Sequence, residues 1–156
     1  MTRVIIAHAE KSDLRTILNL QHLSYQSEAL SLNDFSIQPL TQTSAEIEQE
    51  YEKCVFLKAQ DEDGTLLGSV RASTENDTTF IGKLFVHPEK QGQRIGEQLL
   101  LAIERECPAA RYELFTRNRN TRSVRLYERV GYVQFKEQKI SDRLTFAFFK
   151  KQASRR

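Results

Sequence analysis

The sequence predicts an α/β domain of the α+β type: a mixed, mostly antiparallel sheet of about seven strands with helices on both faces. Strand-like and helix-like segments alternate along the 156 residues. Three strand-like segments follow one another between residues 55 and 86, which predicts an antiparallel meander. The last two are separated only by residues 141–143, which predicts a closing hairpin. We expect residues 1–150 to form one domain and residues 151–156 a basic C-terminal tail.

The N-terminal third is expected to contain one strand and two helices. The apolar run at residues 4–8 predicts a short strand. From Leu14, apolar side chains recur at helical spacing, which predicts a helix ending near Ser27. Residues 28–42 have no apolar period and predict a loop, with room for one irregular turn. A second helix should follow at about residues 44–53.

The meander is expected at residues 55–60, 66–73 and 78–86. Gly64 supplies the positive φ that the first connecting turn needs. Pro88 ends the third strand because proline cannot donate to a ladder.

The most amphipathic segment is the helix expected at residues 92–107. Its apolar stripe consists of Ile95, Leu99, Ala102 and Ile103. The elements expected after it are a strand at 111–116, a helix at 121–130 ended by Gly131, and hairpin strands at 133–140 and 144–150.

The charge balance argues against a nucleic-acid partner. The chain has 23 Lys and Arg against 21 Asp and Glu, whereas nucleic-acid-binding domains concentrate positive charge. No apolar stretch approaches the roughly 20 residues that span a bilayer, and the N-terminus lacks the pattern of a signal peptide. We therefore expect a cytoplasmic protein with no membrane partner.

The cysteines and histidines predict neither a metal site nor a nucleophile. Cys54 and Cys107 lie beside apolar residues and are expected to be free thiols, which suits a reducing compartment. The three histidines are scattered without ligand spacing. No Cys–His arrangement is visible, which disfavours a cysteine acyl-enzyme.

A glycine-bearing loop joins the third meander strand to the amphipathic helix. Its residues are Gln91, Gly92, Gln93, Arg94, Ile95 and Gly96. The first N–H groups of a helix have no internal partner and the helix dipole adds positive potential, so this arrangement suits a phosphate. The alternative is an ordinary helix start with glycines for close packing. The loop is neither a Walker P-loop nor a dinucleotide motif.

A second segment, residues 120–132, carries Asn120 and Tyr127 two helical turns apart, on roughly similar faces. A tyrosine at this place could give its proton to a leaving group. The alternative is a core aromatic residue on a short helix.

Together the two segments resemble the GCN5-related N-acetyltransferase (GNAT) family. Gln91 and Gly96 match the family's Gln/Arg-x-x-Gly-x-Gly/Ala pyrophosphate signature. The family's Asn-x-x-Ala-x-x-Leu-Tyr-x-x-x-Gly-Phe/Tyr pattern is matched at Asn120, Leu126, Tyr127, Gly131 and Tyr132, with Ser123 in place of Ala. The resemblance covers residues 80–132 in motif and the rest of the chain in topology.

The resemblance implies direct transfer of acetyl from acetyl-CoA to a primary amine of a small molecule or peptide. Tyr127 would protonate the CoA thiolate, and Glu28 would contact the acceptor. A bulge in the third meander strand would free an N–H for the thioester carbonyl. The implied coenzyme-binding residues are Leu84, Phe85, Val86, Gln91, Gly92, Gln93, Arg94, Ile95, Gly96, Asn120, Ser123 and Tyr127.

Two positions depart from the family pattern. Arg94 stands where the family usually has glycine, so its side chain should point outward, where it can pair with phosphates. Phe80 stands where the family often has a glutamate base, so that role falls to another group or to water. The alternative for Glu28 is a solvated glutamate at a helix end. His87, directly after the third meander strand, is a weaker candidate for acceptor contact, and its alternative is a cap of the loop.

Two other functions stay open. A catalytically inactive acyl-CoA-binding domain, a sensor or partner-binding module, fits the missing glutamate, whereas Tyr127 favours the enzyme. A nucleic-acid-binding module, with steep salt dependence, would use Arg117, Arg119, Arg122, Arg125 and Arg129. Apolar surface on both faces of the last hairpin, at Phe146, Phe148 and Phe149, suits a homodimer interface.

Overall fold

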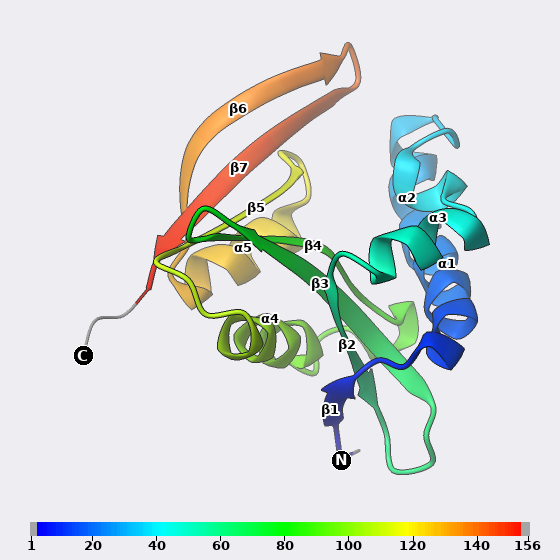
Figure 1. Cartoon of the computed structure of the whole chain (residues 1–156). Coiled ribbons are helices and arrows are strands. Elements are labelled where there is room, and N and C mark those ends of the chain that lie inside the picture. Colours follow the sequence, from blue (N-terminus) through cyan, green and yellow to red (C-terminus); the bar gives the residue numbers. More distant parts are fainter. Residues whose placement is uncertain (1–2, 154–156) are drawn as a thin grey trace.

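The computed structural model describes residues 3–153 and confirms the predicted fold, a seven-stranded mixed sheet between helices (Figure 1). The strand order is β1-β2-β3-β4-β5-β7-β6. Neighbouring strands are antiparallel except β4 and β5, which are parallel. The strands are β1 (Ile5–His8), β2 (Val55–Gln60), β3 (Leu66–Glu75), β4 (Thr78–Val86), β5 (Arg111–Arg117), β6 (Val133–Ser141) and β7 (Leu144–Gln152).

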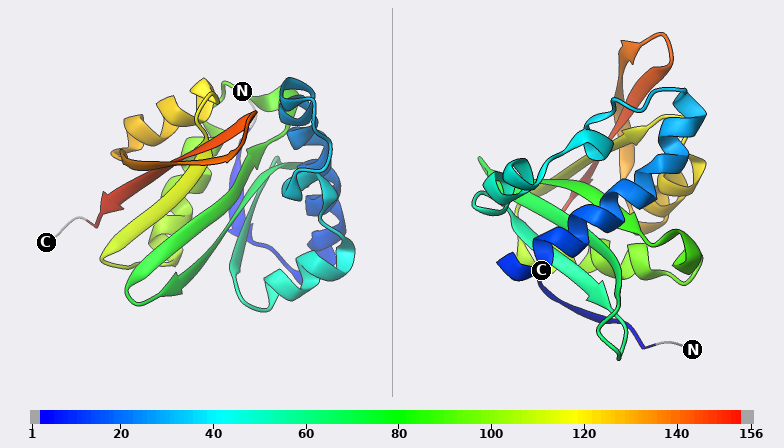
Figure 2. Two further views of the ribbon diagram at one scale, coloured as in Figure 1. Left: turned by 90° about the horizontal axis from the view of Figure 1, so that it is seen from above. Right: turned by 90° about the vertical axis from the view of Figure 1, so that its right-hand side faces the viewer.

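The helices lie on both faces of the sheet (Figure 2). α4 covers one face of β3 and β4. The group α1 to α3 packs on the opposite face of these strands. The helices are α1 (Leu14–Leu32), α2 (Gln38–Thr41), α3 (Ser44–Tyr51), α4 (Ile95–Glu106) and α5 (Thr121–Val130). Short 3-10 turns stand at Lys11–Asp13 and Pro88–Lys90.

Each face of the sheet has its own apolar core. Leu99 of α4 lies in the core beneath α4 and α5, and Ile17 of α1 lies in the other. The neighbours Phe56 and Leu57 on β2 belong to different cores. This division follows from the alternation of side chains along a strand.

The prediction that the first helix ends near Ser27 is wrong, because α1 continues to Leu32. Its buried stripe extends through Ala29 and Leu32. Asn33 then ends the helix in the left-handed conformation, with φ 53°, and donates its N–H to carbonyls of the last turn. Glu28 is therefore inside a helix rather than at its end, and α2 supplies the irregular turn expected before α3.

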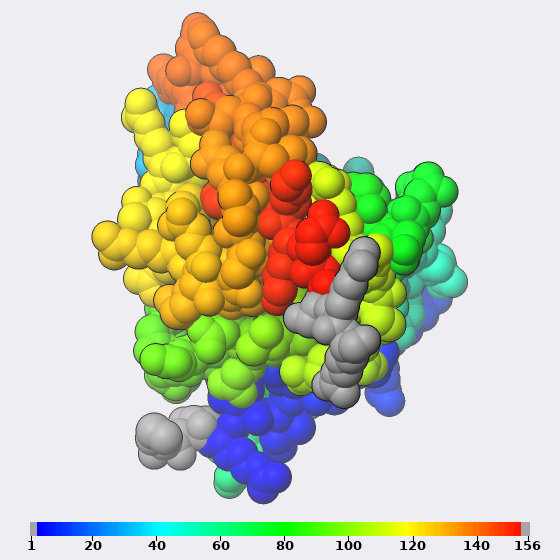
Figure 3. Space-filling model, turned by 90° about the vertical axis from the view of Figure 1, so that its left-hand side faces the viewer, coloured from blue at the N-terminus to red at the C-terminus, as the bar shows by residue number. Residues whose placement is uncertain are grey.

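The last hairpin differs from the prediction in two ways. β7 extends to Gln152, so Lys151 and Gln152, expected in the tail, pair with β5; residues 154–156 of that tail lie outside the described residues. Phe149 is fully buried in the core beneath α4 and α5. The expectation of open apolar surface on both faces of the hairpin is therefore wrong. β6 remains at the edge of the sheet, beside α5 on the molecular surface (Figure 3).

Within residues 3–153 no helix is long and apolar enough to cross a membrane. The same stretch has no group of three or more His, Cys, Asp or Glu side chains placed to hold a metal. Cys54 and Cys107 are free, and burial raises the pKa of both thiols. Both thiols therefore stay protonated, and poorly nucleophilic, at neutral pH.

Gly68 of β3 is required by the close approach of β4. A Cβ at this position would lie 2.6 Å from the carbonyl oxygen of Phe85. We predict that Gly68→Ala lowers the free energy of unfolding by about 1–3 kcal/mol, as overpacking does, measured by urea denaturation. The control is Gly82→Ala on β4, where a Cβ would meet no atom within 4 Å. Equal losses in the two variants would contradict this account.

Candidate active site

The parallel strands β4 and β5 are paired only where they begin. Residues 78–80 pair with residues 111–113, and the ladder then stops, although β4 continues to Val86 and β5 to Arg117. The strands therefore diverge toward their carboxyl ends. Beyond Phe80, the backbone groups on this edge of β4 have no ladder partner. In open α/β sheets, ligands bind in a crevice outside the carboxyl ends of the strands, which is the end at which β4 and β5 separate.

β4 contains the expected bulge. Between the pairs Gly82–Arg71 and Phe85–Ser69, two residues of β4 oppose one residue of β3. The first of the two, Lys83, has a positive φ of 50°. An extra residue of this kind bends the strand and re-aims its backbone groups, here on the stretch next to the divergence.

The loop before α4 leaves the N-terminus of that helix uncapped. Arg94 occupies the N-cap position and makes no side-chain cap, since a guanidinium has no acceptor. By contrast, Thr43 and Asn120 cap α3 and α5 through their side-chain oxygens. Gly92 turns the loop with φ 84°. The first N–H groups of α4 are thus available to an anion.

Arg94 adopts φ 63° and ψ 20°, a left-handed conformation that favours glycine. This accounts for the glycine usual at this position in the family pattern. The Arg94 side chain is 75% exposed and lies 3.9 Å from Glu97, so it points outward as expected. Glu97 also accepts a hydrogen bond of 2.8 Å from Arg129, which ties α5 to the first turn of α4.

Tyr127 lies on the buried face of α5. Its ring packs against Phe149 and Tyr132, with centroids 5.6 and 6.2 Å away. Burial raises the pKa of Tyr127 to about 12, although a hydrogen bond with Ser123 opposes the shift. The phenol keeps its proton at neutral pH and can donate a hydrogen bond. Asn120 accepts from the N–H of Ser123 at 3.1 Å, so its carbonyl oxygen is engaged as the cap of α5.

One face of α1 crosses the ends of both diverging strands. Ser24 Oγ donates to the carbonyl of Val86 at 3.5 Å, at the end of β4. Ser31 Oγ accepts from the guanidinium of Arg117 at 3.0 Å, at the end of β5. Glu28 lies on the same helix face, four residues after one contact and three before the other.

Glu28 is half-buried, and its surroundings shift its ionisation. Burial raises the pKa of its carboxyl, and nearby Arg117 opposes the shift. The charge of Glu28 in turn contributes to the raised pKa of Tyr25 and of Tyr127. The carboxyl of Glu28 is therefore near enough for its charge to act on the Tyr127 phenol. Sequence reasoning did not assign Tyr25 to the site, although helical spacing from Glu28 could have indicated it. Arg117 was considered only for the nucleic-acid alternative, because nothing in the sequence linked it to Glu28.

A buried polar cluster fixes the rotation of α1. The guanidinium of Arg71 is buried and donates to Gln21 of α1, to Gln42, and to Glu50 at 2.6 Å. Although burial acts to raise the pKa of Glu50, the charge of Arg71 and these hydrogen bonds hold it below its usual range. Gln21 lies about two helical turns before Glu28, so the cluster determines which side of α1 faces the diverging strands.

Neither Phe80 nor His87 supplies a base. Phe80 is 44% exposed at the last β4–β5 pair. Glu113 opposite it forms an ion pair of 2.8 Å with Arg111. His87 Nδ1 accepts from the N–H of Glu89 at 3.1 Å, so it caps the loop.

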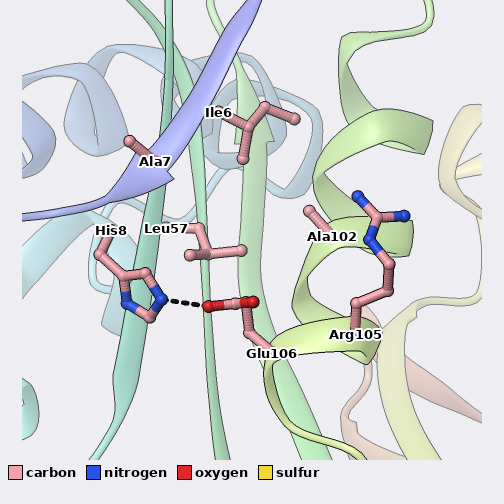
Figure 4. Close-up of a pocket in the computed structure, with 7 residues that line it drawn as sticks. All are labelled: Ile6, Ala7, His8, Leu57, Ala102, Arg105 and Glu106. Carbon is pink, nitrogen blue, oxygen red and sulfur yellow. Dashed lines mark hydrogen bonds and ion pairs between the residues drawn. The ribbon is translucent and has the colours of Figure 1, made fainter.

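A hollow at the other end of α4 is separate from this site (Figure 4). His8 and Glu106 are hydrogen-bonded to each other there, beside Arg105. Arg105 and Glu106 stand in the last turn of α4, whereas the uncapped N–H groups are in its first turn. The lining contains none of the residues predicted for the site.

The family assignment follows from a match to a family model. Residues 14–132 match the model described as "Acetyltransferase (GNAT) family". The chain belongs to the GNAT acetyltransferase family. The matched residues include α1, the loop before α4 and Tyr127. A comparison with curated proteins found no match.

Solved structures of GNAT acetyltransferases have the same fold. The Escherichia coli ribosomal-protein-S18-alanine N-acetyltransferase is 15% identical, with TM-score 0.80 over 99% of this chain and 96% of that one. The Sinorhizobium meliloti phosphinothricin acetyltransferase, solved with acetyl-CoA, is 20% identical, with TM-score 0.77 over 96% and 88%. The Thermoplasma acidophilum paia N-acetyltransferase, solved with coenzyme A, is 18% identical, with TM-score 0.75 over 97% and 99%.

The conformation of Arg94 predicts that glycine is tolerated there. Arg94→Gly removes left-handed strain of about 1 kcal/mol, partly offset by the greater freedom of the unfolded chain. We expect Arg94→Gly to be at least as stable as Arg94→Ala, which loses the same charge but keeps the strain, in urea denaturation. We also expect Arg94→Gly to bind acetyl-CoA in calorimetry. A less stable glycine variant, or one that has lost binding, would contradict this reading of the loop.

Proposed function

We propose that this GNAT protein transfers an acetyl group from acetyl-CoA to a primary amine by direct attack. The observation that supports this most is the placement of Glu28 and Tyr127. They come from helices on opposite faces of the sheet, and the charge of Glu28 acts on the Tyr127 phenol where β4 and β5 diverge. The uncapped N-terminus of α4 is the next α-helix start along the chain after β4.

The proposed coenzyme site uses the free edge of β4 and the start of α4. Along Leu84, Phe85 and Val86, the edge of β4 that faces away from β3 has no ladder partner in β5. This edge suits an extended amide-bearing chain, which can join the sheet as a strand does. The N–H groups of residues 91–96 suit a pyrophosphate, and the exposed Arg94 adds positive charge. When bound, acetyl-CoA supplies an acetyl thioester at this edge.

Glu28 is the proposed base. An amine must be neutral to attack, so a neighbouring group has to accept its proton. The raised pKa of Glu28 makes the carboxylate a better proton acceptor than an exposed glutamate. Its place on the face of α1 that contacts the ends of β4 and β5 supports this role.

Tyr127 is proposed to stabilise the leaving sulfur by donating a hydrogen bond. A phenol with a pKa of about 12 would lose about 5 kcal/mol in fully protonating a thiolate of ordinary pKa near 8.5. Hydrogen bonding therefore fits better than complete transfer. Once Glu28 has taken one proton from the ammonium, the neutral nitrogen would attack; it would lose its second proton to solvent as the C–N bond forms, and the departing sulfur would gain one proton from solvent.

Glu28→Gln tests the proposed base. We expect kcat/KM to fall by about 100-fold or more, measured by release of free CoA thiol with an amine substrate. The control is Glu48→Gln, because Glu48 is exposed on α3. An unchanged rate in Glu28→Gln would remove this residue from the mechanism.

The same substitution should stabilise the fold at neutral pH. The folded-state pKa of Glu28 is raised above its unfolded value, so its charged form destabilises the folded protein once both states are ionised. We expect Glu28→Gln to raise Tm at pH 7–8, and the difference to vanish below about pH 4. A variant that is both slower and less stable would indicate a structural role instead.

The inactive acyl-CoA-binding alternative would bind the coenzyme without releasing thiol to any amine, and the placement of Glu28 beside Tyr127 favours the enzyme. The nucleic-acid alternative is weakened because one of its arginines, Arg129, is engaged by Glu97.

The cytoplasmic location and the homodimer stay predictions. The edge strand β6, with exposed Val133 and Ile140, is where we would seek a second copy, by light scattering.

A further inference from the structure

Arg117 differs from Arg71 and Arg111 of this sheet in having no ion-pair partner among the described residues. Within residues 3–153, the side chains of Arg71, Arg111 and Arg117 each have a buried Nε outside any well-formed hydrogen bond, although that of Arg111 lies 2.8 Å from Glu113. Arg71 pairs with Glu50 and stacks on Phe56, and Arg111 pairs with Glu113 and lies over Phe135. No carboxylate of the described residues lies within ion-pair distance of Arg117, whose recorded side-chain partner is a hydroxyl.

The unbalanced guanidinium lies beside the proposed base. Arg117 is the last residue of β5, and Ser31 holds it at 3.0 Å. Ser31 is one helical turn after Glu28 on the same face of α1. Arg117 is the charged group that acts on the Glu28 carboxyl, yet the two are not paired. A positive and a negative group therefore stand side by side, and each has capacity for another partner.

Aromatic side chains continue the same face of the sheet. Phe115 lies two residues before Arg117 on β5 and therefore points the same way. Its ring is 4.7 Å from that of Phe146 and 5.3 Å from that of Phe148, both on β7. Phe115 is 48% exposed, and no helix covers this part of the face (Figure 1). An apolar wall is thus available next to the two charges.

We infer that the acceptor is a free α-amino acid with an apolar or aromatic side chain. Arg117 binds its carboxylate, Glu28 receives its amine, and the Phe115 cluster contacts its side chain. An α-amino acid carries its two charged groups on one carbon, which matches the neighbouring but unpaired Glu28 and Arg117. A polyamine or an aminoglycoside would bring further positive charge against Arg117, at a cost. This inference rests on the proposed acetyl transfer.

Matched pairs of amines test it. L-Phenylalanine and 2-phenylethylamine differ by the carboxylate alone, as do L-leucine and 3-methylbutylamine. We expect kcat/KM to favour the amino acid of at least one pair by about 10- to 100-fold, the range of a hydrogen bond to a charged group. Arg117→Gln should remove this preference by raising KM for the amino acid far more than for the plain amine, so that the two members of a pair become nearly equal substrates.

Two variants act as controls. Arg119→Gln removes an equal charge two residues away, at an exposed position, and should keep the preference. Arg117→Lys keeps the charge beside Glu28 but loses the planar guanidinium. Its preference for the amino acid should lie between that of the unmodified protein and that of Arg117→Gln. Comparing the amines on the unmodified protein needs no variant, so misfolding of Arg117→Gln leaves the test intact.

The outcomes separate the inference from the function beneath it. Turnover of the plain amines without preference for either amino acid overturns the inference alone. An equal loss of kcat/KM for the amino acid and for its plain amine in Arg117→Gln also overturns the inference. Arg117 would then act only through Glu28 or through the stability of the fold. If no amine yields free CoA thiol, the proposed function fails and the inference fails with it.

Discussion

β4 and β5 share a ladder over only three residue pairs, and the rest of the site depends on their divergence. A parallel pair that stayed joined would engage the backbone of Leu84 to Val86 and close the sheet. Because the pair separates, α1 can reach the ends of both strands, at Val86 and Arg117, and the charge of Glu28 can act on Tyr127. The close packing at Gly68 and the bulge at Lys83 shape β4 next to this divergence.

Several features of the site cost stability. Arg94 holds a left-handed backbone, Glu28 carries a half-buried charge, and Arg117 buries an N–H without a partner. Such local costs concentrate at functional sites, since the rest of the fold supports them. Here the Arg71 cluster, which joins α1, α3 and β3, is part of that support. It is polar and well buried, so it restricts α1 to one rotation.

The sequence predicted the strands, the meander and the two motifs, because these depend on local periodicity, glycines and spacing. It did not predict that α1 reaches Leu32, since the stripe through Ala29 and Leu32 is interrupted by polar residues at the surface. Nor did it predict that β7 lies between β5 and β6, which depends on contacts far apart in sequence. The place of Arg117 was not predicted for the same reason: the sequence suggested it only for nucleic-acid binding, whereas its neighbours Ser31 and Glu28 are distant along the chain.

The most direct test of the account is a calorimetric titration of the protein with acetyl-CoA, with NAD as the control nucleotide. The account predicts saturable binding of acetyl-CoA and none of NAD, because the free edge of β4 suits the amide-bearing arm and the open start of α4 suits the pyrophosphate. Absence of acetyl-CoA binding would contradict it. The residues around β4 and β5 would then form a GNAT fold without a coenzyme site.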